Sequence, residues 1–123
     1  MTFQSLGLCA PILAALKEQG YEAPSPIQEQ AIPPALAGRD VLGCAQTGTG
    51  KTAAFALPII QNLMKPSDKK HSKKVIRSLI LTPTRELALQ IAENLNEYGS
   101  HTQVRSAVIF GGVSANPQIK ELR

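Results

Sequence analysis

The stretch AQTGTGKT at residues 45–52 decides the fold. It follows a short apolar segment, 40–44, and precedes the segment 51–64, which predicts a helix. Glycines here let the backbone bend so that its amide groups face a phosphate oxygen, and the helix amino terminus adds partial positive charge. Lys51 then reaches the β and γ phosphates, and the Thr52 hydroxyl suits Mg²⁺. The stretch predicts a phosphate-binding loop, and the alternative is a glycine-rich turn with one exposed lysine.

The segments around this loop predict alternating strands and helices. The expected strands are 40–44, 75–82 and 104–110, and the expected helices are 11–20, one that starts at 26 and is broken by Pro33-Pro34, 51–64, 84–98 and one that opens at 116–117. Apolar strands that alternate with helices are typical of a parallel sheet with crossover helices. The chain has 123 residues, which suits one small α/β domain.

The positive charge of the chain is concentrated in one segment. The formal net charge is +4, and six of the 13 basic residues fall within 65–77: Lys65, Lys69, Lys70, Lys73, Lys74 and Arg77. This segment is either a solvated connection or a source of nonspecific attraction to a nucleic acid. The first residues lack the features of a secretory signal, no apolar run is long enough to cross a membrane, and the two cysteines show no metal-type spacing. These features predict a cytoplasmic protein that does not bind membranes.

The segment before the loop offers candidates for binding a nucleotide base. The Gln28 amide can pair with N6 and N7 of adenine, or it can reach back to the Ser25 backbone amide as part of a capping box. Local spacing does not separate these two interpretations. Phe3 and Tyr21 can pack on a purine face, or they can be aromatic residues of the core.

Two further groups of residues follow predicted strands at the edge where ligands bind in open α/β sheets. Pro83, Thr84 and Arg85 suit a phosphate oxygen, with Arg85 as a forked donor. The alternative is that Thr84 caps the next helix and Arg85 pairs with an acid. The pair Gly111 and Gly112 allows close approach of a nucleic-acid backbone, or forms only a flexible turn.

Taken together and in this order, these motifs resemble the first RecA-like domain of a DEAD-box RNA helicase. Residues 20–28 match the Q motif of that family, 45–52 match motif I, 83–88 match motif Ia, and 111–112 match its paired glycines. The resemblance implies a three-layer αβα P-loop domain and an ATP-dependent activity that unwinds RNA duplexes, with ATP and Mg²⁺ as cofactors. The segments 3–8 and 110–114 look most like the bacterial RhlE-type subgroup.

The resemblance also implies roles for particular residues. It places the adenine beside Phe3, Tyr21 and Gln28, the phosphates on Gln46, Thr47, Gly48, Thr49, Gly50, Lys51 and Thr52, and the RNA backbone on Pro83, Thr84, Arg85, Gly111 and Gly112. Lys51 and Thr52 take the catalytic roles within the chain, and Thr52 is the metal ligand. The RNA contact is expected to be independent of base sequence.

The acidic motif that names the family does not occur in the sequence, since no Asp-Glu pair is present. We therefore expect residues 1–123 to be the amino-terminal part of the first domain, with a sheet incomplete in strands and negligible ATPase on its own. An exposed sheet edge would also allow two such pieces to dimerise. The alternatives are a P-loop ATPase that acts on DNA or on no nucleic acid, and a stand-alone, non-catalytic nucleotide-binding module.

Overall fold

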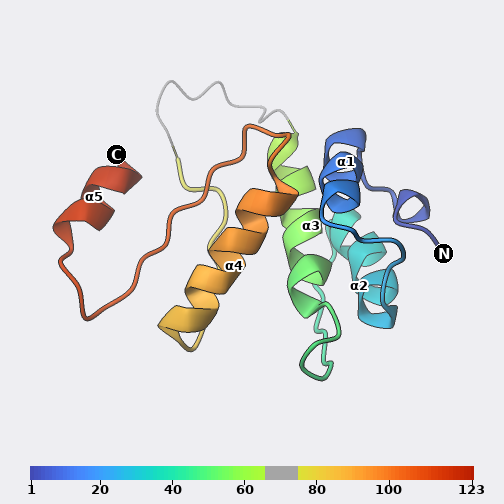
Figure 1. Ribbon diagram of the computed structural model, residues 1–123, viewed down its shortest axis with the longest axis horizontal. Coiled ribbons are helices and arrows are strands. Elements are labelled where there is room, and N and C mark those ends of the chain that lie inside the picture. Colours follow the sequence, from blue (N-terminus) through green and yellow to red (C-terminus); the bar gives the residue numbers. More distant parts are fainter. Residues whose placement is uncertain (66–74) are drawn as a thin grey trace.

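The computed structural model describes residues 1–65 and 75–123, and all of its regular elements are helices (Figure 1). They are the short 3₁₀ helix η1 (Gln4–Leu6), α1 (Ala10–Glu18), α2 (Pro26–Leu36), α3 (Lys51–Met64), α4 (Arg85–Tyr98) and α5 (Asn116–Leu122). The predicted helices are therefore confirmed, with bounds shifted by a few residues.

Helix α3 lies at the centre of the helical layer. It packs against α2 on one side and α4 on the other, and α1 contacts α4 (Figure 1). The core consists mainly of aliphatic side chains from the segment 6–8 and from α1, α2 and α3, joined by the aromatic rings of Phe3 and of Tyr98 at the end of α4: Phe3, Leu6, Leu8, Ile12, Leu16, Ile32, Ala53, Ala56, Leu57, Ile60 and Tyr98. Burial of this apolar surface fixes the position of the start of α3 and of the glycine loop 45–50 that precedes it.

Helix α2 runs through Pro33-Pro34, where the sequence predicts a break. The prolines lie in the last turn of the helix, which ends at Leu36. Proline has no amide proton, so each of them removes one hydrogen bond from this turn. The Pro33 carbonyl still accepts from the Ala37 amide at 3.1 Å. Ala31 and Ile32 are buried just before the prolines, so packing of this turn outweighs the local cost.

The predicted parallel sheet is not seen. Within the described residues, the segments 40–46, 75–82 and 103–110 have no regular secondary structure and form no ladder with one another. Several of their apolar side chains face solvent, with Leu42 93% and Leu81 86% exposed. An apolar run favours an extended conformation, but a parallel ladder also needs a second strand about 4.8 Å away. The described segments form no such hydrogen-bonded ladder.

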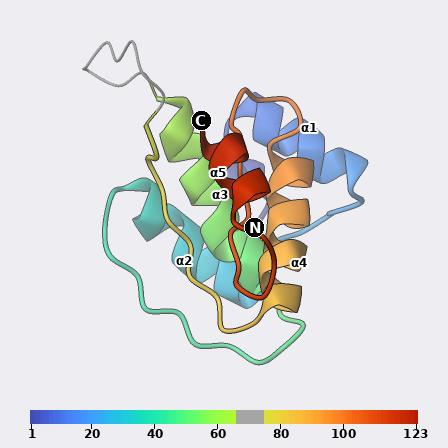
Figure 2. The ribbon, with the colours of Figure 1, turned by 90° about the vertical axis from the view of Figure 1, so that its left-hand side faces the viewer.

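These segments nevertheless run between helices. Figures 1 and 2 show α5 on the far side of 75–82 and 103–110 from α1 and α2. Because no strand is assigned in the described part of the chain, dimerisation through a strand edge stays a prediction. None of the described helices is long and apolar enough to cross a membrane.

Most of the basic segment lies outside the described residues, including Lys69, Lys70, Lys73 and Lys74. Arg77 lies inside them, and its guanidinium donates to the carbonyl of Leu63 at 2.8 Å and to that of Lys65 at 3.5 Å. A cation at the last carbonyls of a helix stabilises the negative end of its dipole. Arg77 therefore caps α3.

Candidate functional site

The loop before α3 has the geometry that phosphate binding requires. Gly48 and Gly50 have φ values of +82° and +86°, a region that residues with a Cβ rarely adopt. The Thr49 hydroxyl donates to the Gln46 carbonyl at 2.6 Å, which closes the turn. Lys51 is the first residue of α3 and is exposed. The loop thus places a helix amino terminus and a free ammonium group beside the same exposed turn.

Gln28 connects this loop to α2. Its side chain is 2% exposed; the carbonyl oxygen accepts from the Ser25 amide at 3.0 Å, and the side-chain amide donates to the Gly50 carbonyl at 3.2 Å. The capping interpretation is therefore confirmed. The second bond was not predicted from the sequence. An amide oxygen has two lone pairs and an amide nitrogen two protons, so each of these atoms keeps one unused hydrogen-bonding position, although the side chain is covered in this structure.

The aromatic pair Phe3 and Tyr21 lies at a groove of about 340 Å³. The two rings meet edge to face, with centroids 6.3 Å apart. Phe3 is buried in the core, whereas Tyr21 is 39% exposed. Lys17 and Glu22 also line this groove, and Gln28 does not. The structure therefore joins Phe3 to Tyr21 at this groove, and it joins Gln28 to the loop before α3.

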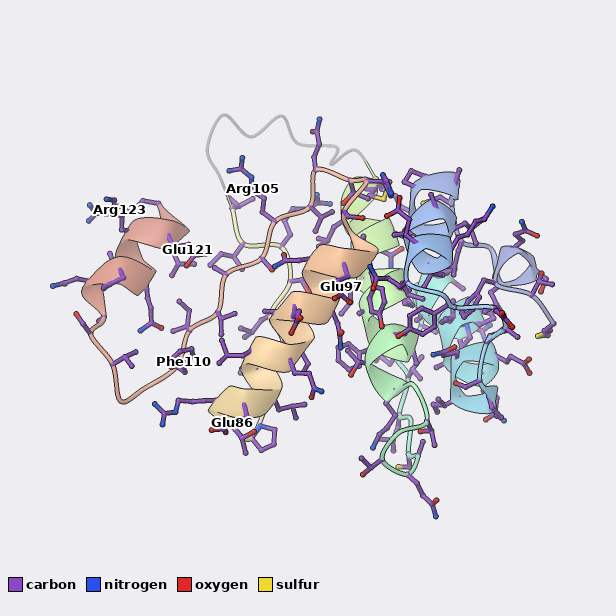
Figure 3. The ribbon with its side chains drawn as sticks, viewed as in Figure 1. Glu86, Glu97, Arg105, Phe110, Glu121 and Arg123 are labelled. Carbon is purple, nitrogen blue, oxygen red and sulfur yellow. The ribbon has the colours of Figure 1, made fainter. Side chains whose placement is uncertain are left out.

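A second cluster forms at the start of α4. A depression of about 250 Å³ is lined by residues from two separate segments, among them Pro83, Thr84, Arg85, Phe110 and Gly111. The guanidinium carbon of Arg85 lies 5.9 Å from the centroid of the Phe110 ring, a cation–π contact. Figure 3 shows Phe110 on the segment between α4 and α5, on the side of the first turn of α4, where Glu86 is labelled.

The alternatives for this cluster are now decided in part. The Thr84 hydroxyl accepts from the Leu87 amide at 3.2 Å, so Thr84 is the N-cap of α4. Arg85 has no acidic partner among the described residues. Gly112 has a φ of +80°, and a Cβ there would lie 3.3 Å from a guanidinium nitrogen of Arg85. The glycine therefore leaves room for the arginine.

The sequence did not predict two glutamines that support the cluster at the start of α4 and the groove at Phe3. Gln118 of α5 accepts from the Phe110 amide at 2.8 Å and donates to the Phe110 carbonyl at 3.2 Å, which fixes the segment before the two glycines. Gln61 of α3 donates to the Gly7 carbonyl and accepts from the Cys9 amide, so it holds the segment that follows Phe3. The hydrogen bonds of both glutamines join different segments of the chain, and no local sequence pattern predicts them.

The chemistry of the loop fits a nucleotide with Mg²⁺. No cluster of three metal-ligating His, Cys, Asp or Glu side chains occurs in the described ranges. Mg²⁺ typically takes only one or two protein ligands in such sites and the rest of its ligands from phosphates and water. The half-buried Thr52 directly after Lys51 is suited to be one of them.

Comparison with known proteins gives a consistent result. The model of the DEAD/DEAH box helicase family matches residues 25–123. The chain is 47% identical over 122 residues to the DEAD-box ATP-dependent RNA helicase RhpA of Helicobacter pylori, and 50% identical over 123 residues to the ATP-dependent RNA helicase DeaD of Escherichia coli. Each alignment covers 99% of this chain, but only 23% of RhpA and 19% of DeaD.

Solved structures agree. A DEAD box protein from Methanococcus jannaschii superposes with a TM-score of 0.87 at 39% identity, over 100% of this chain and 32% of that one. The RNA helicase Prp28 from Chaetomium thermophilum, whose structure holds ADP, gives a TM-score of 0.84 at 37% identity, over 96% and 28%. The chain thus spans a third or less of each of these four proteins.

Proposed function

The chain belongs to the DEAD/DEAH box helicase family, and from this premise we propose that it binds ATP for the remodelling and unwinding of RNA duplexes. The observation that carries the proposal is the loop at 45–52, where two glycines of positive φ precede an exposed lysine at the first position of α3. The ADP-bound relative Prp28, 37% identical, supports a nucleotide as the ligand.

We assign the phosphates to the loop 46–50 with Lys51 and Thr52, and the base to the side of Gln28, Tyr21 and Phe3. When bound, Mg²⁺ would neutralise phosphate charge, and Thr52 would be its ligand from this chain. Lys51 would contribute charge-assisted hydrogen bonds to the outer phosphates. Gln28 would read adenine while its existing bonds hold it against Gly50.

The cluster at the start of α4 is proposed to bind the RNA backbone. Arg85 lies over the ring of Phe110 and beside Gly112, so its guanidinium is held at the surface instead of being paired with an acid. The bare backbone at 111–112 leaves space for a sugar or a phosphate. Such contacts position the nucleic acid and carry no information about its sequence.

We further propose that residues 1–123 form the amino-terminal part of the first RecA-like domain. The similarity over nearly the whole chain and the small share of each relative that it covers support a part of a longer protein, and the order of the motifs from residue 20 to residue 112 supports its place in the first domain. The 123 residues by themselves are expected to show negligible hydrolysis of ATP. The assignment to the RhlE-type subgroup and to the cytoplasm stays a prediction.

The test uses the complete natural polypeptide that carries this sequence. We expect RNA-stimulated ATP hydrolysis, and we expect Lys51→Ala to weaken ATP binding by roughly 10- to 100-fold, the range of a lost charge-assisted hydrogen bond. Lys65→Ala is the matched control, because Lys65 is also exposed and lies at the opposite end of α3. Equal effects of the two substitutions would refute the phosphate assignment.

The nucleic acid used in the assay separates the alternatives. Hydrolysis stimulated by RNA and not by DNA supports the proposal. Stimulation by DNA alone indicates a DNA-dependent ATPase. Binding of ATP without hydrolysis under either condition indicates a non-catalytic nucleotide-binding module.

A further inference from the structure

Tyr98 is a buried tyrosine, and its hydroxyl takes no part in the contacts of the loop 45–52 or of the cluster at the start of α4. It is 1% exposed and ends α4. Its hydroxyl oxygen lies 2.8 Å from that of Tyr21, a residue 77 positions earlier in the chain. A buried phenol needs such a partner, because an unpaired hydroxyl in an apolar core costs free energy.

The Tyr21 ring is held from two sides. Phe3 meets it edge to face at 6.3 Å and 85°, and Tyr98 meets it at 5.9 Å and 70°. Tyr21 is the exposed member of this group of three rings, and it lines the groove of about 340 Å³ together with Phe3. The part of Tyr21 that can meet a ligand is thus oriented by contacts with residues on its other sides.

Within the described residues, Tyr21 is the hydrogen-bond partner of the Tyr98 hydroxyl. Burial, followed by the hydrogen bond with Tyr21, raises the pKa of Tyr98 well above its ordinary value. The hydroxyl therefore stays protonated throughout the physiological range. If Tyr21 rotated into solvent, Tyr98 would be left with a buried and unpaired group, so the bond selects one orientation of the Tyr21 ring.

We propose that Tyr98 is a positioning residue for the base of the bound nucleotide. Through its hydroxyl it fixes the orientation of the Tyr21 ring, which lines the groove where the base would bind. This inference rests on the proposed function, because it takes the ligand of that groove to be the base of ATP. Tyr98 itself touches no ligand. Its effect reaches the base only through Tyr21.

The experiment is a double-mutant cycle in the complete natural polypeptide, with Tyr98→Phe, Tyr21→Phe and both together. Each substitution deletes one oxygen and keeps the ring. We expect each single variant to raise the Kd for ATP by roughly 2- to 10-fold, the range for one hydrogen bond. The double variant should be no weaker than the weaker single variant, because the same bond is lost in all three.

Inorganic tripolyphosphate is the second probe, since it has the phosphates of ATP and no base. Its Kd should be the same in the wild type and in all three variants. A general disturbance of the fold would weaken both ligands. Tyr21→Phe breaks the same bond from its exposed side, so the cycle remains informative if Tyr98→Phe lowers the melting temperature.

Three results would overturn the inference: an unchanged Kd for ATP in Tyr98→Phe, an equal loss for ATP and tripolyphosphate, or fully additive effects in the double variant. These differ from a failure of the proposed function. In that case the wild type itself would bind no ATP, and both proposals would fall together.

Discussion

Replacement of Gln28 by leucine tests whether this side chain holds the phosphate loop in the absence of any ligand. Leucine fills a similar volume, but it makes neither the bond to the Ser25 amide nor the bond to the Gly50 carbonyl. If Gln28 served only to read adenine, its loss would leave the stability of the ligand-free protein unchanged.

The magnitude follows from what each partner loses. The Gly50 carbonyl also accepts from the Ala54 amide at 3.2 Å, so it keeps one partner after the substitution. The Ser25 N–H has no second acceptor among residues 1–65 and 75–123, so after the substitution it must donate to water at the start of α2. One net hydrogen bond contributes about 1 kcal/mol. The loss of two therefore predicts a destabilisation of about 2 kcal/mol by Gln28→Leu.

The assay is urea unfolding followed by far-UV circular dichroism, without nucleotide. Gln30→Leu is the matched control, because Gln30 lies on the same helix and is exposed. Exposed substitutions of this kind change the free energy of unfolding by about 0.5 kcal/mol or less. Hydrogen exchange gives a local check, since the Ser25 amide should lose protection in Gln28→Leu only. A variant as stable as the wild type, with Ser25 still protected, would refute the reasoning.

Three further predictions concern the loop, the RNA cluster and the buried tyrosine. Gly50→Ala should destabilise the protein more than Gly38→Ala, and of the two only Gly50→Ala should weaken ATP binding. Both glycines have positive φ, but only at Gly50 would a Cβ collide with the Gln28 side chain. Urea unfolding and ATP titration compare the two variants, and equal effects would count against the packing argument. Arg85→Gln should weaken RNA binding and reduce the dependence of log K on log salt by about one charge; an unchanged slope means that Arg85 contacts no phosphate. Above pH 10 the free energy of unfolding should fall, because the raised pKa of Tyr98 keeps its proton on in the folded state while the unfolded state releases it; stability measured against pH should fall less in Tyr98→Phe, and parallel curves would contradict this.

The local elements were predictable where the signal is local. The glycine loop, the helix that begins at Lys51 and the Thr84 cap depend on residues within a few positions of one another, and each is confirmed. The Ser25–Gln28 cap is of the same kind. The continuation of α2 past Pro33 was not predictable, because the local sequence indicates only the hydrogen bonds that proline removes. It does not show that burial of the preceding turn offsets this loss.

The sheet shows the same limit from the other direction. The apolar runs near Leu42, Leu79 and Leu81 indicate strands, but pairing is a property of two segments, and the described residues bring no two of these together in a ladder. The composition of a segment indicates a preference for the extended conformation. It does not show whether a second segment pairs with it.

The sequence by itself was enough to indicate the family, because its motifs occur together and in the order of that family, and to predict a loop of glycines with positive φ before Lys51, because those residues lie within a few positions of one another. It left Gln28 with two competing partners, and only the tertiary structure showed the second bond, to Gly50. The contact of Arg85 with Phe110 and the hydroxyl pair of Tyr21 and Tyr98 likewise appear only on folding. Each of these contacts joins residues far apart in the chain, and their meeting depends on how the helices pack and not on any local pattern.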